Sequence, residues 1–184
     1  MKSTLFTILI ITIISCSKQS ELREAFNCNV DPPENTVAVY DFNKNFKLNI
    51  PNNWKTELYY DKYQSEMFTA DTTKQLTSTF ILDASFNLGA LNFDEDFQKK
   101  TDSILTAKNL QKVNSGNVSF QSKPAIWYLA KGEKNSFNYH QLNLTVQLSE
   151  NTYFNAYSEI YGDAHVEIRI CEAIAILETI EFLQ

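Results

Sequence analysis

The stretch from residue 124 to residue 130 limits the possible folds of this chain most, because it is apolar at consecutive positions. Successive side chains of a strand point to opposite faces of its sheet. Trp127 and Tyr128 therefore lie on opposite faces, and both faces must be covered by other parts of the chain. We expect a central sheet with helices packed on both sides.

Other segments alternate between apolar and polar residues, as strands with one buried face do. Residues 76–88 give the clearest pattern, with Phe80, Leu82 and Phe86 on one face. Asp83, Ser85 and Asn87 lie on the other face. The remaining predicted strands are 46–51, 55–61, 66–71, 110–113, 118–121, 137–148 and 153–160, with a turn at 114–117.

Two helices are expected, at about residues 93–108 and 164–182. Asn92 is a suitable N-cap for the first, with Glu95 at the capping-box position, and Asp163 is a suitable N-cap for the second. The last helix has an apolar stripe that includes Val166 and Ile170. Together the elements predict an α+β fold, an α/β/α sandwich with a central antiparallel sheet.

The first residues have the pattern of a bacterial lipoprotein signal peptide. Lys2 precedes an apolar core of about ten residues, which is too short to span a bilayer. The core ends in Ile13-Ile14-Ser15-Cys16, which resembles the lipobox, where the cysteine thiol accepts a diacylglyceryl group. We therefore predict a signal peptide at residues 1–15 and lipidation, with palmitate, at Cys16. The alternative is an ordinary secretory signal with an incidental cysteine.

The predicted anchor also indicates a location. Ser17 is not acidic, which resembles the signal that sorts Gram-negative lipoproteins to the outer membrane. Residues 16–35 are polar and contain adjacent prolines, so they are expected to form a tether, and residues 36–184 a single domain. The net charge of −6 and the lack of a Lys/Arg cluster argue against a nucleic-acid partner. The acidic net charge either keeps the protein soluble or, alternatively, forms an acidic binding face.

No motif for catalysis, cofactor binding or metal binding is present. The four glycines are too far apart for a phosphate-binding loop, and neither His140 nor His165 has a second ligand at metal spacing. Residues 41–45 begin like a calcium loop, but the required glycine is replaced by Phe46. Residues 94–96 are acidic and suit a helix start better than a cation site. We expect no cofactor and no metal.

Tyrosines form two groups, around Tyr60 and around Tyr157, and they serve either as packed strand residues or as binding anchors. The order of elements also resembles the PsbP-like domains. Residues 46–54 (FKLNIPNNW), 122–128 (SKPAIWY) and 179–182 (TIEF) carry the resemblance, which extends from Val39 to Phe182. These domains include a photosystem accessory subunit, a Ran-binding import factor and bacterial lipoproteins of unknown role. The resemblance implies a binding or accessory module without catalytic residues.

Cys28 and Cys171 are the two cysteines that remain once Cys16 is lipidated, and the cell envelope permits oxidation. We predict a disulfide between them, which would place Phe26 and Val30 against the last helix. The alternative is two separate thiols.

Two functions remain open. The first is a membrane-anchored envelope lipoprotein that acts as a non-catalytic binding or accessory module for an envelope protein. The second is an envelope hydrolase with an unrecognised active site, in which His140 or His165 acts as the base beside a Ser, Asp or Glu. A polar cleft that contains such a pair would favour the hydrolase.

Overall fold

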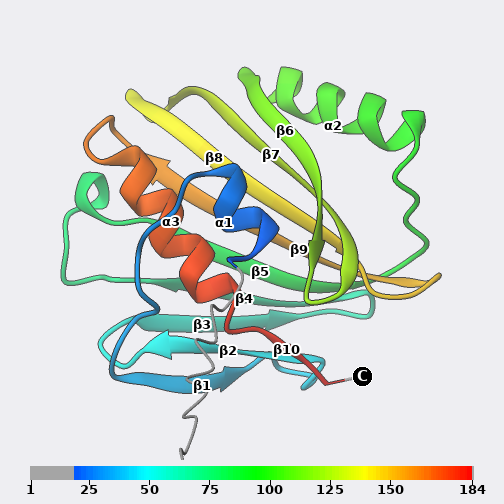
Figure 1. The fold of residues 1–184 in the computed structure, drawn as a ribbon, viewed down its shortest axis with the longest axis horizontal. Coiled ribbons are helices and arrows are strands. Elements are labelled where there is room, and N and C mark those ends of the chain that lie inside the picture. The colour runs from blue at the N-terminus through cyan, green and yellow to red at the C-terminus, as the bar shows by residue number, and fades with distance from the viewer. Residues whose placement is uncertain (1–18, 184) are drawn as a thin grey trace, which may run out of the picture.

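A computed structural model describes residues 19–183 and places them in two antiparallel sheets with three α-helices (Figure 1). The helices are α1 (Glu21–Ala25), α2 (Glu95–Ala107) and α3 (Val166–Leu177), with a short 3-10 helix η1 (Leu76–Ser78). The small sheet, in the order β1-β2-β10, contains β1 (Thr36–Tyr40), β2 (Phe46–Pro51) and β10 (Glu181–Phe182). The large sheet, in the order β3-β4-β5-β9-β8-β7-β6, contains β3 (Lys55–Tyr60), β4 (Gln64–Ala70), β5 (Ile81–Leu88), β6 (Leu110–Phe120), β7 (Lys123–Lys134), β8 (Phe137–Gln147) and β9 (Thr152–Tyr161). The predicted α+β class and the dominant antiparallel sheet are confirmed.

One face of the large sheet, which we call the first face, carries the core. Figure 1 shows α1 and α3 lying across this face, with the small sheet beside them. Along β4, β5, β7, β8 and β9 the buried residues of this face lie at alternate positions, as predicted for β5 and β8. They include Met67, Leu82, Trp127, Leu144 and Phe154. Phe46 of β2 packs edge-on against Phe154, which joins the small sheet to this core.

The second face is covered only in part. Helix α2 packs against β6, at one side of the sheet, and Leu105 is its one buried residue. Tyr128 lies beneath this helix and is buried, whereas Trp127, the next residue, is buried in the core of the first face. Strand β7 is therefore apolar on both faces because both are covered. The cover on the second face, provided by α2, is therefore less extensive than the cover on the first face.

The turn predicted at residues 114–117 is wrong. Strand β6 runs through these residues without a break, with one register shift between Lys112 and Asn114. Gly116 packs against Trp127, and a Cβ at this position would lie 3.0–3.1 Å from the indole ring. The glycine leaves room for that ring, and a sequence pattern does not distinguish this use from a turn.

Both predicted N-caps are displaced along the chain. The side chain of Asp94, instead of Asn92, caps α2 and accepts from the backbone N–H groups of Asp96 and Phe97, at 3.1 and 3.0 Å. Helix α3 begins after His165, which has a positive φ of 54°, and Asp163 bonds Asn138 instead of capping. The last helix also ends at Leu177, and β10 follows it and pairs with β2.

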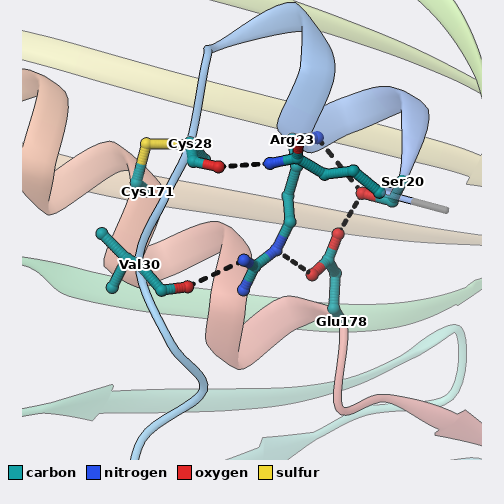
Figure 2. The surroundings of a disulfide bond; sticks show 7 residues. Ser20, Arg23, Cys28, Val30, Cys171 and Glu178 are labelled. Atoms are coloured by element: carbon teal, nitrogen blue, oxygen red, sulfur yellow. Dashed lines mark hydrogen bonds and ion pairs between the residues drawn. A yellow bond between two sulfur atoms is a disulfide. The ribbon is translucent and has the colours of Figure 1, made fainter. Parts of the chain in front are cut away.

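The described part of the predicted tether packs against the domain. Leu22 of α1 is fully buried, and Phe26 lies 4.6 Å from Trp127 between ring centroids. The side chain of Arg23 bonds Glu178 at 2.6 Å and the carbonyl of Val30 at 2.7 Å (Figure 2). Residues 19–30 therefore form part of the folded body, whereas a boundary at residue 36 stays a prediction.

Candidate functional site

The second face of the large sheet carries a row of polar side chains near its centre. Ser85 of β5, Asn155 of β9 and Thr145 of β8 are cross-strand neighbours. Asn143 lies two residues from Thr145 on the same face. Ser85, Asn143 and Thr145 are 5%, 2% and 4% exposed, so this row is polar and yet nearly removed from bulk solvent. Burial of polar groups is costly, so the row needs hydrogen-bond partners.

These side chains bond one another. The amide of Asn143 donates to Oδ1 of Asn155 at 2.8 Å, and the hydroxyl of Thr145 lies 2.8 Å from the same oxygen. Nearby, the amide of Asn87 donates to the hydroxyl of Ser85 at 3.0 Å. The network holds the amide and hydroxyl groups in fixed positions, as a preorganised recognition surface requires.

Helix α2 covers this row and leaves two adjoining cavities. One has a volume of about 250 Å³ and lies between α2 and the centre of the sheet. The other, of about 260 Å³, lies between α2 and strands β6 and β7. Phe97, Thr101 and Tyr128 line both cavities, so we treat them as one site and call it the α2 cleft.

Two carboxyl groups flank the α2 cleft. Glu66 lines it, and Asp83 lies beside Tyr157, another lining residue. Burial, the charge of Glu66 and a hydrogen bond that Asp83 donates to Glu66 raise the pKa of Asp83 to about 8. Asp83 is therefore protonated at neutral pH and serves as a hydrogen-bond donor.

The raised pKa of Asp83 predicts how stability depends on pH. Asp83 keeps its proton when folded, whereas the unfolded carboxyl loses it near pH 4, so the free energy of unfolding falls as pH rises from about 4 to about 8. The slope is at most about 1.4 kcal/mol per pH unit. Asp83→Asn should remove this slope and be more stable than the wild type at pH 8–9. Urea unfolding across this range measures it, with Asp96→Asn on exposed α2 as control. Equal slopes in wild type and Asp83→Asn would contradict the expectation.

The structure joins Cys28 and Cys171 in a disulfide, with an S–S distance of 2.03 Å, as predicted (Figure 2). Phe26 and Val30 pack against the core on either side of Cys28. Figure 2 shows the bond fixing the N-terminal segment to α3, close to the ion pair between Arg23 and Glu178. Cys16 lies outside the described residues, and lipidation there stays a prediction.

The two histidines do not meet in one site. His140 lies on the first face and lines a cavity of about 430 Å³ together with Asp163 and Glu167. Burial lowers the pKa of His140, and its Nδ1 has no hydrogen-bond partner among residues 19–183. No Ser, Thr or Cys is among the residues that line this cavity. His165 is exposed at the start of α3. Neither histidine therefore lies beside a hydroxyl or thiol nucleophile in the cavities described.

The calcium-like segment 41–45 is a capped turn. Asp41 is 1% exposed, and its carboxylate accepts from the backbone N–H of Phe46 at 2.8 Å and from the amide of Asn45 at 2.9 Å. The carboxylate thus stabilises the turn into β2. Within residues 19–183, no group of three or more His, Cys, Asp or Glu side chains is placed to hold a metal ion.

The tyrosines divide by environment. Tyr59, Tyr60 and Tyr63 are 49%, 59% and 62% exposed, which contradicts the expectation that they are packed strand residues. Tyr153 and Tyr157 line the α2 cleft. The alternation in residues 76–88 places Ser85 and Asn87 on a polar face, but it does not reveal the cleft. The missing signal is spatial, because the cleft forms where α2 lies over residues from six strands, β4 to β9.

This fold has counterparts among solved structures, although no protein-family model and no curated protein sequence matches the chain. Cyanobacterial PsbP (CyanoP) from Synechocystis sp. PCC 6803 has a TM-score of 0.57 at 8% identity, over 84% of this chain and 96% of that chain. LpqN of Mycobacterium tuberculosis, involved in cell envelope biogenesis, has a TM-score of 0.50 at 13% identity, over 79% and 88%. A Bacteroides thetaiotaomicron structure has a TM-score of 0.55 at 12% identity over 82% of this chain, which spans about half (49%) of that structure.

The chain therefore has a PsbP-like fold, as its resemblance to those domains implied. Structural similarity at such low sequence identity establishes the fold alone, so the function must be argued from the site. None of the helices in residues 19–183 is both long and apolar enough to cross a bilayer.

Proposed function

We propose that this protein is a lipid-anchored lipoprotein of the cell envelope that acts as a non-catalytic binding or accessory module. The α2 cleft carries this proposal, because it presents positioned amide and hydroxyl groups without a nucleophile and base in contact. Support for the envelope comes from the lipobox-like residues 13–16, from the Cys28–Cys171 disulfide and from the structural likeness to LpqN. Ser17 favours the outer membrane, and the acidic net charge disfavours nucleic acid.

The proposed anchor would hold the domain close to the membrane. Gln19 follows Cys16 by three residues, and its side chain bonds the carbonyl of Cys28. Three extended residues reach about 10 Å, so a lipid on Cys16 would place the α1 end of the domain near the bilayer surface. Because α1 packs on the first face and α2 on the second, the cleft would remain open to a partner in the envelope.

Membrane attachment should depend on the sulfur of Cys16. Cys16→Ala removes the thiol that accepts the lipid, so we expect an uncleaved precursor that incorporates no labelled palmitate. Metabolic labelling and the mass of the N-terminal peptide measure both effects, and Ser17→Ala is the matched control. A Cys16→Ala protein that is lipidated and processed like the wild type would contradict the proposed anchor.

A hydrolase is the second candidate, and one observation favours it. His140 and Asp163 line the same cavity, and the lowered pKa of His140 keeps the imidazole near pH 7 in the neutral form that can accept a proton. A water molecule would have to be the nucleophile, since no hydroxyl or thiol lines the cavity.

We expect no turnover of ester, peptide or glycan substrates by the mature chain, in the wild type or in His140→Ala. The full mature chain is required because residues 19–30 are part of the folded body. His165→Ala, at an exposed position, is the matched control. Turnover that His140→Ala abolishes and His165→Ala retains would replace the binding proposal with the hydrolase.

The binding proposal is tested by cross-linking in native membranes followed by purification and mass spectrometry. We expect an envelope protein to be cross-linked through positions beside the α2 cleft. A photo-reactive residue in place of Gln98, which lines the cleft, is compared with one in place of Lys44, in the β1–β2 turn. Equal, non-selective cross-links from both positions would contradict a partner at the cleft.

A further inference from the structure

We propose that the α2 cleft binds an uncharged saccharide, with sugar hydroxyls bonded to the amide and hydroxyl row and a sugar ring against its tyrosines. This inference rests on the proposed binding function and names the chemical class that the cleft recognises.

The lining offers both donors and acceptors. An amide side chain carries two donor hydrogens and an acceptor oxygen, and a hydroxyl donates one hydrogen and accepts. Asn87, Asn143 and Asn155 line the cleft together with Ser85 and Thr145. A sugar hydroxyl also donates and accepts, so a ligand with several hydroxyl groups matches such a surface at many points.

Aromatic side chains stand beside this row. Tyr153, Tyr157 and Phe97 line the same cavity and are each half-buried. A tyrosine offers an apolar ring surface together with a polar tip, which suits a ligand that has C–H groups on its faces and hydroxyls on its edge. The cleft therefore combines the two kinds of contact that a sugar ring makes.

The charge of the lining disfavours ionic ligands. The charged residues that line the two cavities are Glu66, Lys100 and Lys112, and Lys112 pairs with Asp102 at 2.6 Å. Asp83 is protonated at neutral pH, so it adds no charge beside the lining. A phosphate or carboxylate ligand would need a cluster of basic groups, which this lining does not supply.

The strands beneath the central cavity disfavour an extended peptide. Such a peptide adds to a sheet by pairing with an edge strand. Strands β4, β5, β9, β8 and β7, whose residues line this cavity, are each paired on both sides, whereas β6, which lines the second cavity, is an edge strand of the large sheet.

Binding is tested with the lipidated mature chain in lipid nanodiscs by isothermal titration calorimetry. The soluble probes are cellobiose, maltose, lactose and N,N′-diacetylchitobiose, each titrated to about 10 mM, the range of weak sugar affinities. A second arm measures co-sedimentation with insoluble cell-wall glycan from the source cells. If the protein binds the insoluble glycan but none of the soluble sugars, the ligand is a polymer of the envelope. If it binds a soluble sugar but not the glycan, the ligand is a free saccharide.

Two variants with matched controls locate the site. Thr101→Trp fills the cleft from α2 and leaves the sheet row intact, and Ser103→Trp places the same side chain at an exposed position of α2. Tyr153→Ala removes a lining ring, and Tyr59→Ala removes an exposed ring outside the cleft. We expect loss of binding with Thr101→Trp, about tenfold weaker binding with Tyr153→Ala, and unchanged binding with both controls.

The outcomes separate this inference from the proposed function. Saccharide binding that Thr101→Trp abolishes and Ser103→Trp retains supports both. No binding of any probe, together with an envelope-protein cross-link that Thr101→Trp abolishes, overturns the saccharide inference and leaves the binding module. Saccharide binding that is unaffected by Thr101→Trp and Tyr153→Ala also overturns the inference, because the site would then lie elsewhere.

Discussion

Removing the Cys28–Cys171 disulfide is expected to lower the free energy of unfolding by about 3–5 kcal/mol. The two cysteines are 143 residues apart, so the bond restricts the unfolded chain over most of its length. Loop-closure entropy rises with the length of the closed loop, and this loop lies at the long end of the usual range. The expected effect is therefore close to the upper values measured for single disulfides.

The folded state adds to this entropic effect. The bond fixes the segment that contains Leu22, which is fully buried, and Phe26, which packs on Trp127. In the absence of the bond, the segment is held by this apolar contact, by the ion pair between Arg23 and Glu178, and by the hydrogen bonds of Ser20 with Glu178 and of Ser119 with Glu21. We expect the segment to separate from α3 before the sheet unfolds, because it has few contacts of its own.

The double variant Cys28→Ala/Cys171→Ala tests this, since it leaves no unpaired buried thiol. Urea unfolding of the variant, and of the wild type with and without reductant, measures the loss. Leu22→Ala keeps the disulfide and removes one buried side chain, at an expected cost of about 2–5 kcal/mol. A double variant as stable as the oxidised wild type would show that the bond does not constrain the chain, and alkylation of both cysteines in fresh envelope protein would show that it is absent there.

The predicted part of the fold depends on local pattern. The alternation in β5 and β8 follows from the apolar side chains of the first face, so the sequence locates β8 and the inward residues Leu82 and Phe86 of β5 correctly. The strand predicted at residues 76–88 begins too early, because Leu76–Ser78 form η1 and β5 begins at Ile81. The disulfide could be predicted because only two cysteines remain once Cys16 is lipidated, and the cell envelope permits their oxidation. In each case the physical cause acts within one segment or on one residue type.

The parts that were not predicted depend on contacts between distant segments. Gly116 is small because Trp127, on the neighbouring strand, occupies the space above it. Residues 181–182 form β10 because β2 offers a free edge there, which overrides the continuing helical pattern. The α2 cleft likewise requires six strands and a helix in their final arrangement, so no single stretch of sequence carries its signature.

The second large effect is expected at Arg169, which has 3% exposure and lies on α3 among apolar residues. Its guanidinium donates to the carbonyls of Thr79 and Tyr161, at 3.0 and 2.9 Å, and to the carbonyl of Gly162 at 3.1 Å. One side chain therefore joins α3 to the start of β5 and to the end of β9. Burial lowers the pKa of Arg169, and the three carbonyl bonds offset the cost of placing its charge there.

Arg169→Met is expected to lower the free energy of unfolding by about 3–5 kcal/mol. Methionine fills similar space but donates no hydrogen bond, so three carbonyl oxygens lose a partner, each at about 1–3 kcal/mol before relaxation and water entry. Arg169→Lys keeps the positive charge but loses the planar guanidinium group, so its loss of unfolding free energy should be intermediate. Lys112→Met, which breaks the exposed pair with Asp102, is the control and should cost at most about 1 kcal/mol. Urea unfolding of the three variants ranks them, and an Arg169→Met protein no less stable than Lys112→Met would show that the three carbonyls do not depend on the guanidinium.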